Sequence, residues 1–111
     1  MAFEVVLAPG ASAALKNLSV PVRAGVVKAL TVHLTHQPTK TSRSRIKRLR
    51  GLSQPQYRLR VGDIRVFYDV TEAQVQVLAI VTKAEAQAWL DEEGTPESYN
   101  TEGGTSGGGQ G

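Results

Sequence analysis

Hydrophobic residues recur with different periods along the first third of the chain. Residues 3–7 form a short apolar run followed by Pro9 and Gly10, which favours a first β-strand that ends there. Ser12 can cap a short helix, and Pro21 suits the first turn of a second helix. In this second segment, which ends before Pro38, apolar residues stand three and four apart, the spacing of a buried helix face: Val22, Val26, Ala29, Leu30 and Leu34.

The rest of the chain alternates apolar and polar residues, the pattern of strands with one buried face. After a polar loop at 39–45, strands are expected at 46–50, 56–61, 64–70 and 74–81. Gly62 and Asp63 form a two-residue hairpin signal, and turns are expected around Ser53–Pro55 and at 71–73. Residues 84–93 have the composition of a short helix, whose Ala88 or Trp89 and Leu90 can pack on the sheet.

These elements predict an α+β fold with the order β-α-α-β-β-β and a short C-terminal helix. A two-helix hairpin would pack on one face of an antiparallel sheet, whose other face can remain open. We expect the domain to occupy residues 1–93, and the glycine-rich residues 94–111 to be a flexible tail.

Length and composition restrict the class of protein. The chain has 111 residues, enough for one small domain. It contains no cysteine, which excludes disulfides, thiolate metal sites and cysteine nucleophiles. No apolar run approaches the ~20 residues that cross a bilayer, and the N-terminus does not resemble a secretory signal. We therefore expect a cytoplasmic protein without a membrane partner.

Charge is distributed unevenly around a formal net value of +3. Residues 38–65 contain nine Lys or Arg residues against one acidic residue, Asp63. Residues 66–111 contain eight acidic residues against one basic residue, Lys83. Such a basic block indicates a polyanion or an acidic protein as partner, the alternative being a solvated charged surface.

The hairpin signal brings part of this charge onto one face. With Gly62 and Asp63 as the turn, Arg60 lies opposite Arg65 and Arg58 lies opposite Phe67. Like charges in this position destabilise the strand pair by about a few tenths of a kcal/mol, and a bound anion would relieve the repulsion. One guanidinium group can bind two phosphate oxygens at once. The Phe67 ring offers a surface on which a base can stack.

This arrangement gives an expectation about stability. We expect Arg60→Ala and Arg65→Ala to abolish activity while leaving the fold intact or slightly more stable. In the alternative interpretation, the arginines extend into water or pair with Asp69 and the acidic C-terminal region.

Other kinds of chemistry lack a signal. The chain has no Walker or G-x-G-x-x-G loop, and no pair of carboxylates at helical spacing on an apolar face. His33 and His36 lie on one helix without a nearby acid, and we interpret both as structural or solvent-facing. We therefore expect neither a metal nor a cofactor.

The basic segment resembles the RelE/ParE superfamily of type II toxins. The motifs are Lys47-Arg48-Leu49-Arg50-Gly51, Tyr57-Arg58-Leu59-Arg60, Gly62-Asp63-Ile64-Arg65-Val66-Phe67-Tyr68 and Val75-Gln76-Val77-Leu78-Ala79-Ile80. The resemblance spans roughly residues 3–90. It implies the architecture predicted above and, on the RelE-like branch, a toxin that enters the ribosomal A site and cleaves mRNA. Its partners would be the ribosome, mRNA and a cognate antitoxin, which we expect to be acidic.

The resemblance also implies roles for individual residues. The basic strand positions of the family correspond to Arg58 and Arg60, and its hairpin arginine corresponds to Arg65. After the last strand, active RelE proteins carry a basic residue and then a tyrosine or histidine, whereas this chain has Lys83 and Trp89. A guanidinium stabilises transition-state charge but is a poor proton acceptor, so Lys83 is the candidate for proton transfer. The candidate RNA-binding residues are Arg43, Arg45, Lys47, Arg48, Arg50 and Phe67.

Two other functions remain open at this point. A ParE-like toxin would bind DNA gyrase and would not need the arginine cluster. A non-cleaving homologue would keep the cluster and bind RNA or an antitoxin without cutting.

Overall fold

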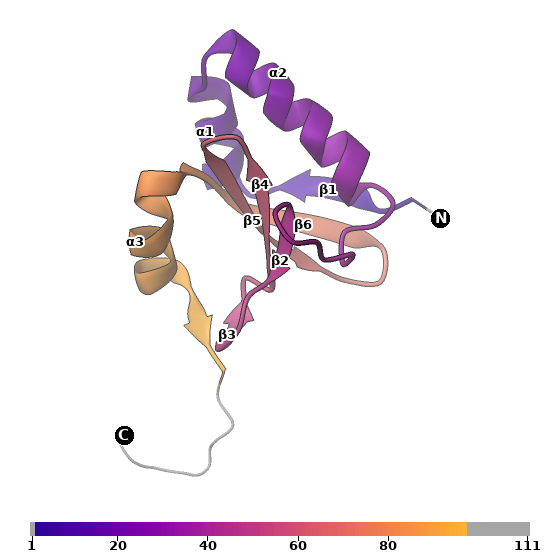
Figure 1. The fold of residues 1–111 in the computed structure, drawn as a ribbon, viewed down its shortest axis with the longest axis vertical. Coiled ribbons are helices and arrows are strands. Elements are labelled where there is room, and N and C mark those ends of the chain that lie inside the picture. The colour runs from indigo at the N-terminus through magenta and orange to yellow at the C-terminus, as the bar shows by residue number, and fades with distance from the viewer. Residues whose placement is uncertain (1, 98–111) are drawn as a thin grey trace.

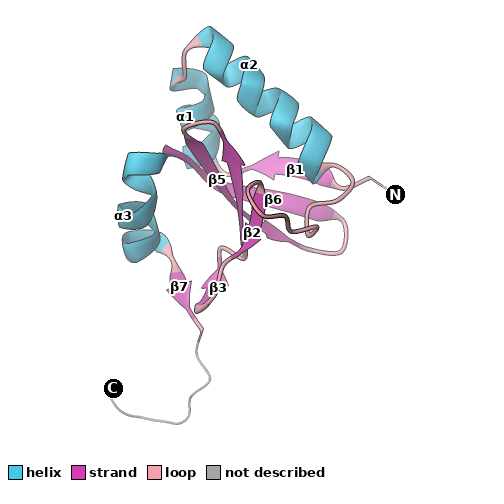
Figure 2. Ribbon diagram, viewed as in Figure 1, coloured by secondary structure: helices cyan, strands magenta, loops and turns pink. Residues whose placement is uncertain are grey.

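The computed structural model describes residues 2–97. Along the chain, its elements are β1 (Glu4–Leu7), α1 (Pro9–Asn17), α2 (Val20–Ala29), the π-helical turn η1 (Leu30–Leu34), β2 (Ile46–Arg48), β3 (Leu52–Gln54), β4 (Tyr57–Val61), β5 (Ile64–Val70), β6 (Gln74–Thr82), α3 (Lys83–Glu93) and β7 (Thr95–Pro96). The predicted α+β class is confirmed (Figures 1 and 2). In this part of the chain, no helix is long and apolar enough to span a membrane.

Five strands form the main sheet, in the order β1-β6-β5-β4-β2. Neighbours from β6 to β2 are antiparallel, as predicted, but β1 runs parallel to β6 at the edge. The sheet is therefore mixed rather than wholly antiparallel. The direction of β1 depends on pairing with a strand about seventy residues away, from Glu4 to Gln74, and no local pattern encodes it.

Both N-terminal helices begin at proline-containing turns. Helix α1 starts at Pro9 after Ala8, so Ser12 lies inside the helix and is not its cap, contrary to our expectation. Proline suits these first positions because its φ angle is already helical and its missing N–H would have no partner there. Helix α2 starts after Ser19, also with proline in its first turn.

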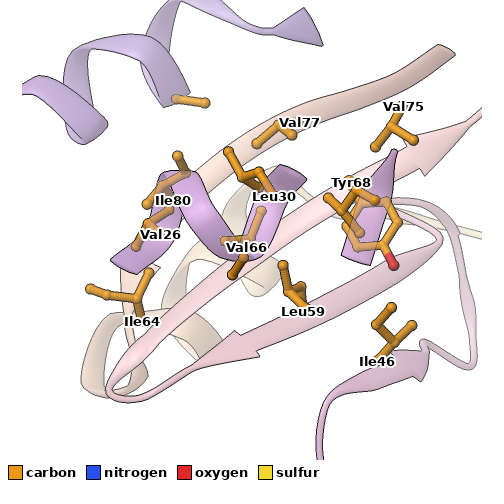
Figure 3. Packing of buried hydrophobic residues seen from close by; sticks show 13 residues of the cluster. Val26, Leu30, Ile46, Leu59, Ile64, Val66, Tyr68, Val75, Val77 and Ile80 are labelled. Atoms are coloured by element: carbon orange, nitrogen blue, oxygen red, sulfur yellow. The ribbon is translucent and has the colours of Figure 1, made fainter. Parts of the chain in front are cut away.

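The core lies between α1 and α2 and one face of the sheet (Figure 3). The buried side chains from the predicted helical stripe are Val26, Ala29, Leu30 and Leu34, whereas Val22 stays exposed. They meet the alternating apolar residues of the strands, among them Leu59, Val66, Tyr68, Val75 and Val77. This face of the sheet is therefore closed, and the charged side chains of the same strands point to the other side.

A second, two-stranded sheet joins β3 to β7. We expected residues 53–55 to form only a turn and the tail to begin at Gly94, but Leu52 pairs with Pro96 and Gln54 with Thr95. Gly94 fits closely there, because a Cβ at this position would lie 2.5 Å from the Leu90 carbonyl oxygen. Strand β7 thus lies just past residue 93, the end of the predicted domain. Residues 98–111 of the predicted tail lie outside the described residues.

Candidate nucleic-acid interface

The β4–β5 hairpin has the predicted register. Arg60 pairs with Arg65, Arg58 with Phe67, and Tyr57 with Tyr68. Gly62 has a φ angle of 57°, the left-handed conformation that glycine adopts without strain. On the adjoining strand β2, Lys47 pairs with Arg58. We call the surface formed by Lys47, Arg58, Arg60 and Arg65 the basic face; it lies on the side of the sheet opposite to α1 and α2.

Arg58 is in the middle of this face and is only half-exposed. Its Nε is buried and has no hydrogen-bond partner among the described residues. Burial and the neighbouring guanidiniums of Arg65 and Arg60 lower the pKa of Arg58. Partly buried positive charge is thus concentrated here, and an anion bound on this face would offset it.

Arg60 and Arg65 differ in their surroundings. Arg60 is exposed, whereas Arg65 is only 8% exposed. The Nη1 of Arg65 donates to the carbonyl oxygens of Gly62 and Ile64, at 2.8 and 3.1 Å. Arg65 therefore supports the hairpin turn, and these hydrogen bonds argue against the expectation that Arg65→Ala would leave the fold intact or slightly more stable.

Phe67 is not available as a stacking surface for a base. Its ring is 1% exposed and is stacked on Trp89 of α3, with centroids 5.2 Å apart and planes 5° from parallel. The predicted packing of Trp89 on the sheet is confirmed, but it covers the ring that we had expected to bind RNA. Sequence alternation correctly placed Phe67 on this face and could not show that a distant helix covers it.

Asp69 does not neutralise the basic face by any hydrogen bond to its arginines. It is 7% exposed and accepts hydrogen bonds from Gln54 Nε2 at 2.5 Å and from the Gln56 N–H at 2.8 Å. Asp69 thus stabilises the turn that enters β4.

The basic block at residues 43–50 is divided between two sides of the sheet. Its five basic side chains are all exposed: Arg43, Arg45, Lys47, Arg48 and Arg50. Lys47 belongs to the basic face, whereas the guanidinium of Arg48 lies over the Tyr57 ring, 5.3 Å from its centroid. Arg48 also donates to the carbonyl oxygens of Leu49 and Gln56, at 3.1 and 2.8 Å. Arg48 therefore has a structural role at the start of β4.

Lys83 lies close to the hairpin turn. It is the first residue of α3, is exposed, and its backbone N–H donates to the Asp63 carbonyl oxygen at 2.8 Å. Thr82 and Glu85 form a capping box that fixes this start of the helix, and the hydrogen bonds with Thr82 lower the pKa of Glu85. The fold therefore brings Lys83 to the end of the hairpin at which Arg60 and Arg65 are paired.

The two histidines and the acidic residues do not assemble a metal centre. Within residues 2–97, no group of three or more His, Cys, Asp or Glu side chains is placed to hold a metal ion. The arrangement offers instead guanidinium donors on an open strand surface, with the backbone of Lys83 at the end of the hairpin. Such groups can bind a phosphate and stabilise negative charge that develops on it.

Comparison with known proteins identifies the architecture. No protein-family model and no curated protein matches the chain. Among solved structures, it is similar to a chain of the archaeal RelE-RelB complex from Pyrococcus horikoshii OT3, with a TM-score of 0.62 and 22% sequence identity. The match covers 75% of this chain and 97% of that chain. It is also similar to the RelB-RelE antitoxin-toxin complex from Methanococcus jannaschii, with a TM-score of 0.53 and 16% identity over 76% of this chain and 96% of the other. The chain therefore has a RelE-like fold.

Proposed function

We propose that the protein is the toxin of a type II toxin–antitoxin system and cleaves mRNA on the ribosome. The observation that carries the proposal is Arg58, which is half-buried among Arg60 and Arg65 and has an unpartnered buried Nε. Crowding of like charges lowers stability, and a bound anion would relieve it, so a ligand explains the arrangement better than the fold does. The RelE-like fold supports RNA as the source of that anion.

The proposed reaction is an attack by an RNA 2′-hydroxyl on its adjacent phosphate. The 2′-oxygen–phosphorus bond forms, the phosphorus–5′-oxygen bond breaks, and the products are a 2′,3′-cyclic phosphate and a 5′-hydroxyl. Arg58 and Arg60 would stabilise the charge that develops on the phosphoryl oxygens. The 2′-hydroxyl proton must leave and the 5′-oxygen must gain one, and Lys83 at the start of α3 is our candidate for one of these transfers.

The proposed partners follow from the same surface. The exposed members of the basic block at residues 43–50 would bind ribosomal RNA through its phosphates, because such contacts supply most sequence-independent affinity. The two similar solved structures are complexes of RelE with RelB. We propose by analogy that an acidic cognate antitoxin covers the basic face in the cytoplasm and blocks access of RNA.

A reconstituted cleavage reaction tests this function. Purified protein is added to ribosomes carrying an mRNA, and the ends of the fragments are mapped. We expect cleavage only of ribosome-bound message, with a cyclic phosphate on the upstream fragment, and none where a 2′-deoxynucleotide replaces the attacking residue. Cleavage of the deoxy-substituted message would contradict the proposed reaction. Ribosome binding without cleavage would favour the non-cleaving homologue, and gyrase inhibition without either would favour a ParE-like toxin.

A further inference from the structure

A second basic site lies outside the basic face, between η1 and the loop that precedes β2. It is a pocket of about 230 Å³, large enough for several water molecules at about 30 Å³ each or for one hydrated anion. Three of its lining residues carry basic side chains: His33, Lys40 and Arg45. The polar remainder consists of Gln37, Thr41 and Ser42, all of which carry hydrogen-bond donors.

The pocket has no acidic counterpart. None of its lining residues is Asp or Glu, and the sequence has no acidic residue between Glu4 and Asp63. A group of cations placed only to stabilise a fold is ordinarily balanced by carboxylates or lies apart in solvent. Here two cations, Lys40 and Arg45, line one cavity, which favours an anionic ligand as the compensating charge.

The loop that carries these side chains is fixed by its own hydrogen bonds. Ser42 Oγ accepts from the N–H groups of Arg45 at 3.0 Å and Ile46 at 3.3 Å, and the Ser42 N–H donates to the Ile46 carbonyl oxygen at 2.9 Å. At its other end, the Pro38 carbonyl oxygen accepts from Tyr68 Oη at 2.6 Å. The pocket is thus formed before any ligand binds, which lowers the entropic cost of binding.

His33 makes the pocket sensitive to protonation. It lies on the π-helical turn, a local distortion that is frequent at functional sites. Partial burial and the Arg45 guanidinium lower the pKa of His33, so the imidazole is neutral at pH 7 in the free protein. The groups around it are the cations of Arg45 and Lys40 and the neutral polar side chains of Gln37, Thr41 and Ser42. A bound dianion or monoanion would offset the two cations and favour the protonated imidazole.

We propose that this pocket binds a phosphate group of the RNA strand that lies on the basic face. The inference rests on the proposed function and adds a second point of attachment. The two sites adjoin through the backbone, because the Arg60 N–H donates to the Arg45 carbonyl oxygen at 2.9 Å. In this proposal one continuous phosphodiester backbone passes from Arg58 and Arg60 to Arg45, whose main chain this hydrogen bond joins to that of Arg60.

The proposal predicts a proton-linked contact. Because binding favours protonated His33, the strand binds more tightly as the pH falls toward 6, and its binding takes up a proton. Losing one phosphate contact reduces the slope of log affinity against log salt by about 0.7 for a single strand. We therefore expect Arg45→Ala and Lys40→Ala each to reduce this slope by about that amount.

Imidazole NMR of the full chain tests the site directly. The ligands are inorganic phosphate and an oligoribonucleotide that is fully 2′-O-methylated and therefore cannot be cleaved. We expect the oligonucleotide to raise the pKa of His33, while the ring resonances of exposed His36, three residues later, stay in place at constant pH. In Arg45→Ala the response of His33 should be lost, while Lys28→Ala on α2 serves as the charge-matched control.

The outcomes separate this proposal from the proposed function. Binding of the oligonucleotide to the basic face is established if Arg58→Gln weakens it. If the oligonucleotide binds in this way and the pKa of His33 does not change, the pocket is not part of the RNA path. If inorganic phosphate shifts the pKa of His33 but the oligonucleotide does not, the pocket is a site for free phosphate and the continuous path is wrong. If the oligonucleotide moves His33 but ribosome-bound message is not cut, the pocket is supported and the nuclease function fails.

Discussion

At the residue scale, Arg60 and Arg65 show that two opposed arginines can have different roles. They pair directly across the hairpin, yet Arg60 extends into solvent and Arg65 is buried against the turn. Of this pair, Arg60 can contact a ligand without breaking a hydrogen bond within the protein, whereas Arg65 cannot. Arg58 lies between these extremes, since it is half-buried and has an unpartnered Nε.

Replacement of Arg65 should therefore destabilise the protein, whereas replacement of Arg60 should not. Arg65→Ala removes the hydrogen bonds to the Gly62 and Ile64 carbonyl oxygens, and we expect the free energy of unfolding to fall by about 2 kcal/mol. Arg60→Ala, at an exposed position, should change it by less than about 0.5 kcal/mol. Urea unfolding of both variants measures the difference. Equal midpoints would show that the Arg65 contacts do not support the turn.

Lys83 permits a test of proton transfer without loss of charge. Lys83→Arg keeps a cation at the start of α3 but replaces an amine that can exchange a proton with a guanidinium that cannot. We expect the single-turnover rate of cleavage on the ribosome to fall by about a hundredfold or more. Thermal stability should not change, because the contact with Asp63 uses the backbone N–H. Undiminished cleavage would leave proton transfer to the ribosome or the message, and Lys28→Arg is the matched control.

At the element scale, the sheet is attached to the chain after η1 by a buried hydroxyl group. Tyr68 Oη on β5 donates to the Pro38 carbonyl oxygen at 2.6 Å, and the ring is stacked on Tyr57 with centroids 5.5 Å apart. Burial, and to a smaller extent the neighbouring Tyr57, raise the pKa of Tyr68. The folded state therefore holds the phenol in its neutral form.

This contact predicts a stability change at alkaline pH. Because the pKa is higher in the folded than in the unfolded chain, the stabilisation is complete below pH about 10, the ordinary value for tyrosine, and is lost as the pH rises further. We expect Tyr68→Phe to lower the free energy of unfolding by about 1 kcal/mol at pH 8. This difference from wild type should narrow above pH about 10, since phenylalanine does not titrate. A constant difference across that range would contradict the assignment.

Helix α3 is held on the sheet mainly by one aromatic contact. It contains no fully buried residue, and Trp89 stacks on Phe67. Such a stack contributes about 1 kcal/mol beyond its buried area, so in Trp89→Ala we expect amide exchange in residues 83–93 to accelerate by about tenfold or more. Exchange in β5 and β6 should stay close to wild type. The exposed neighbour Ala88 provides the control Ala88→Ser, and unchanged protection in Trp89→Ala would show that other contacts hold the helix.

The parts of the fold that sequence predicts well are those with local causes. The β4–β5 register follows from Gly62-Asp63 and strict alternation, so every pair from Tyr57–Tyr68 to Val61–Ile64 agrees with the structure. The parallel direction of β1, the β3–β7 pairing and the covering of Phe67 by Trp89 all depend on segments that are distant in sequence. Alternation also assigned the basic face correctly, but burial of Arg65 arises from the local path of the turn, which residue patterns do not encode.

At the scale of the whole molecule, charge and layers are arranged together. Helices α1 and α2 close one face of the sheet, and α3 covers only part of the other at Phe67. The uncovered part carries Lys47, Arg58 and Arg60. All three belong to residues 5–62, a stretch that contains no Asp or Glu. An open basic surface on a small sheet suits a strand of RNA held at several phosphates.

Primer extension on a translated message after induction in cells measures whether this surface cleaves RNA. Wild type and Lys28→Gln, which removes one positive charge from α2, are predicted to produce the same breaks within the reading frame. These breaks should disappear when the start codon is removed. Arg58→Gln should fold normally and lower their intensity by about a hundredfold or more, because it removes a donor to the phosphate under attack. Breaks of wild-type intensity in folded Arg58→Gln, or growth arrest by the wild type without any breaks, would contradict the account.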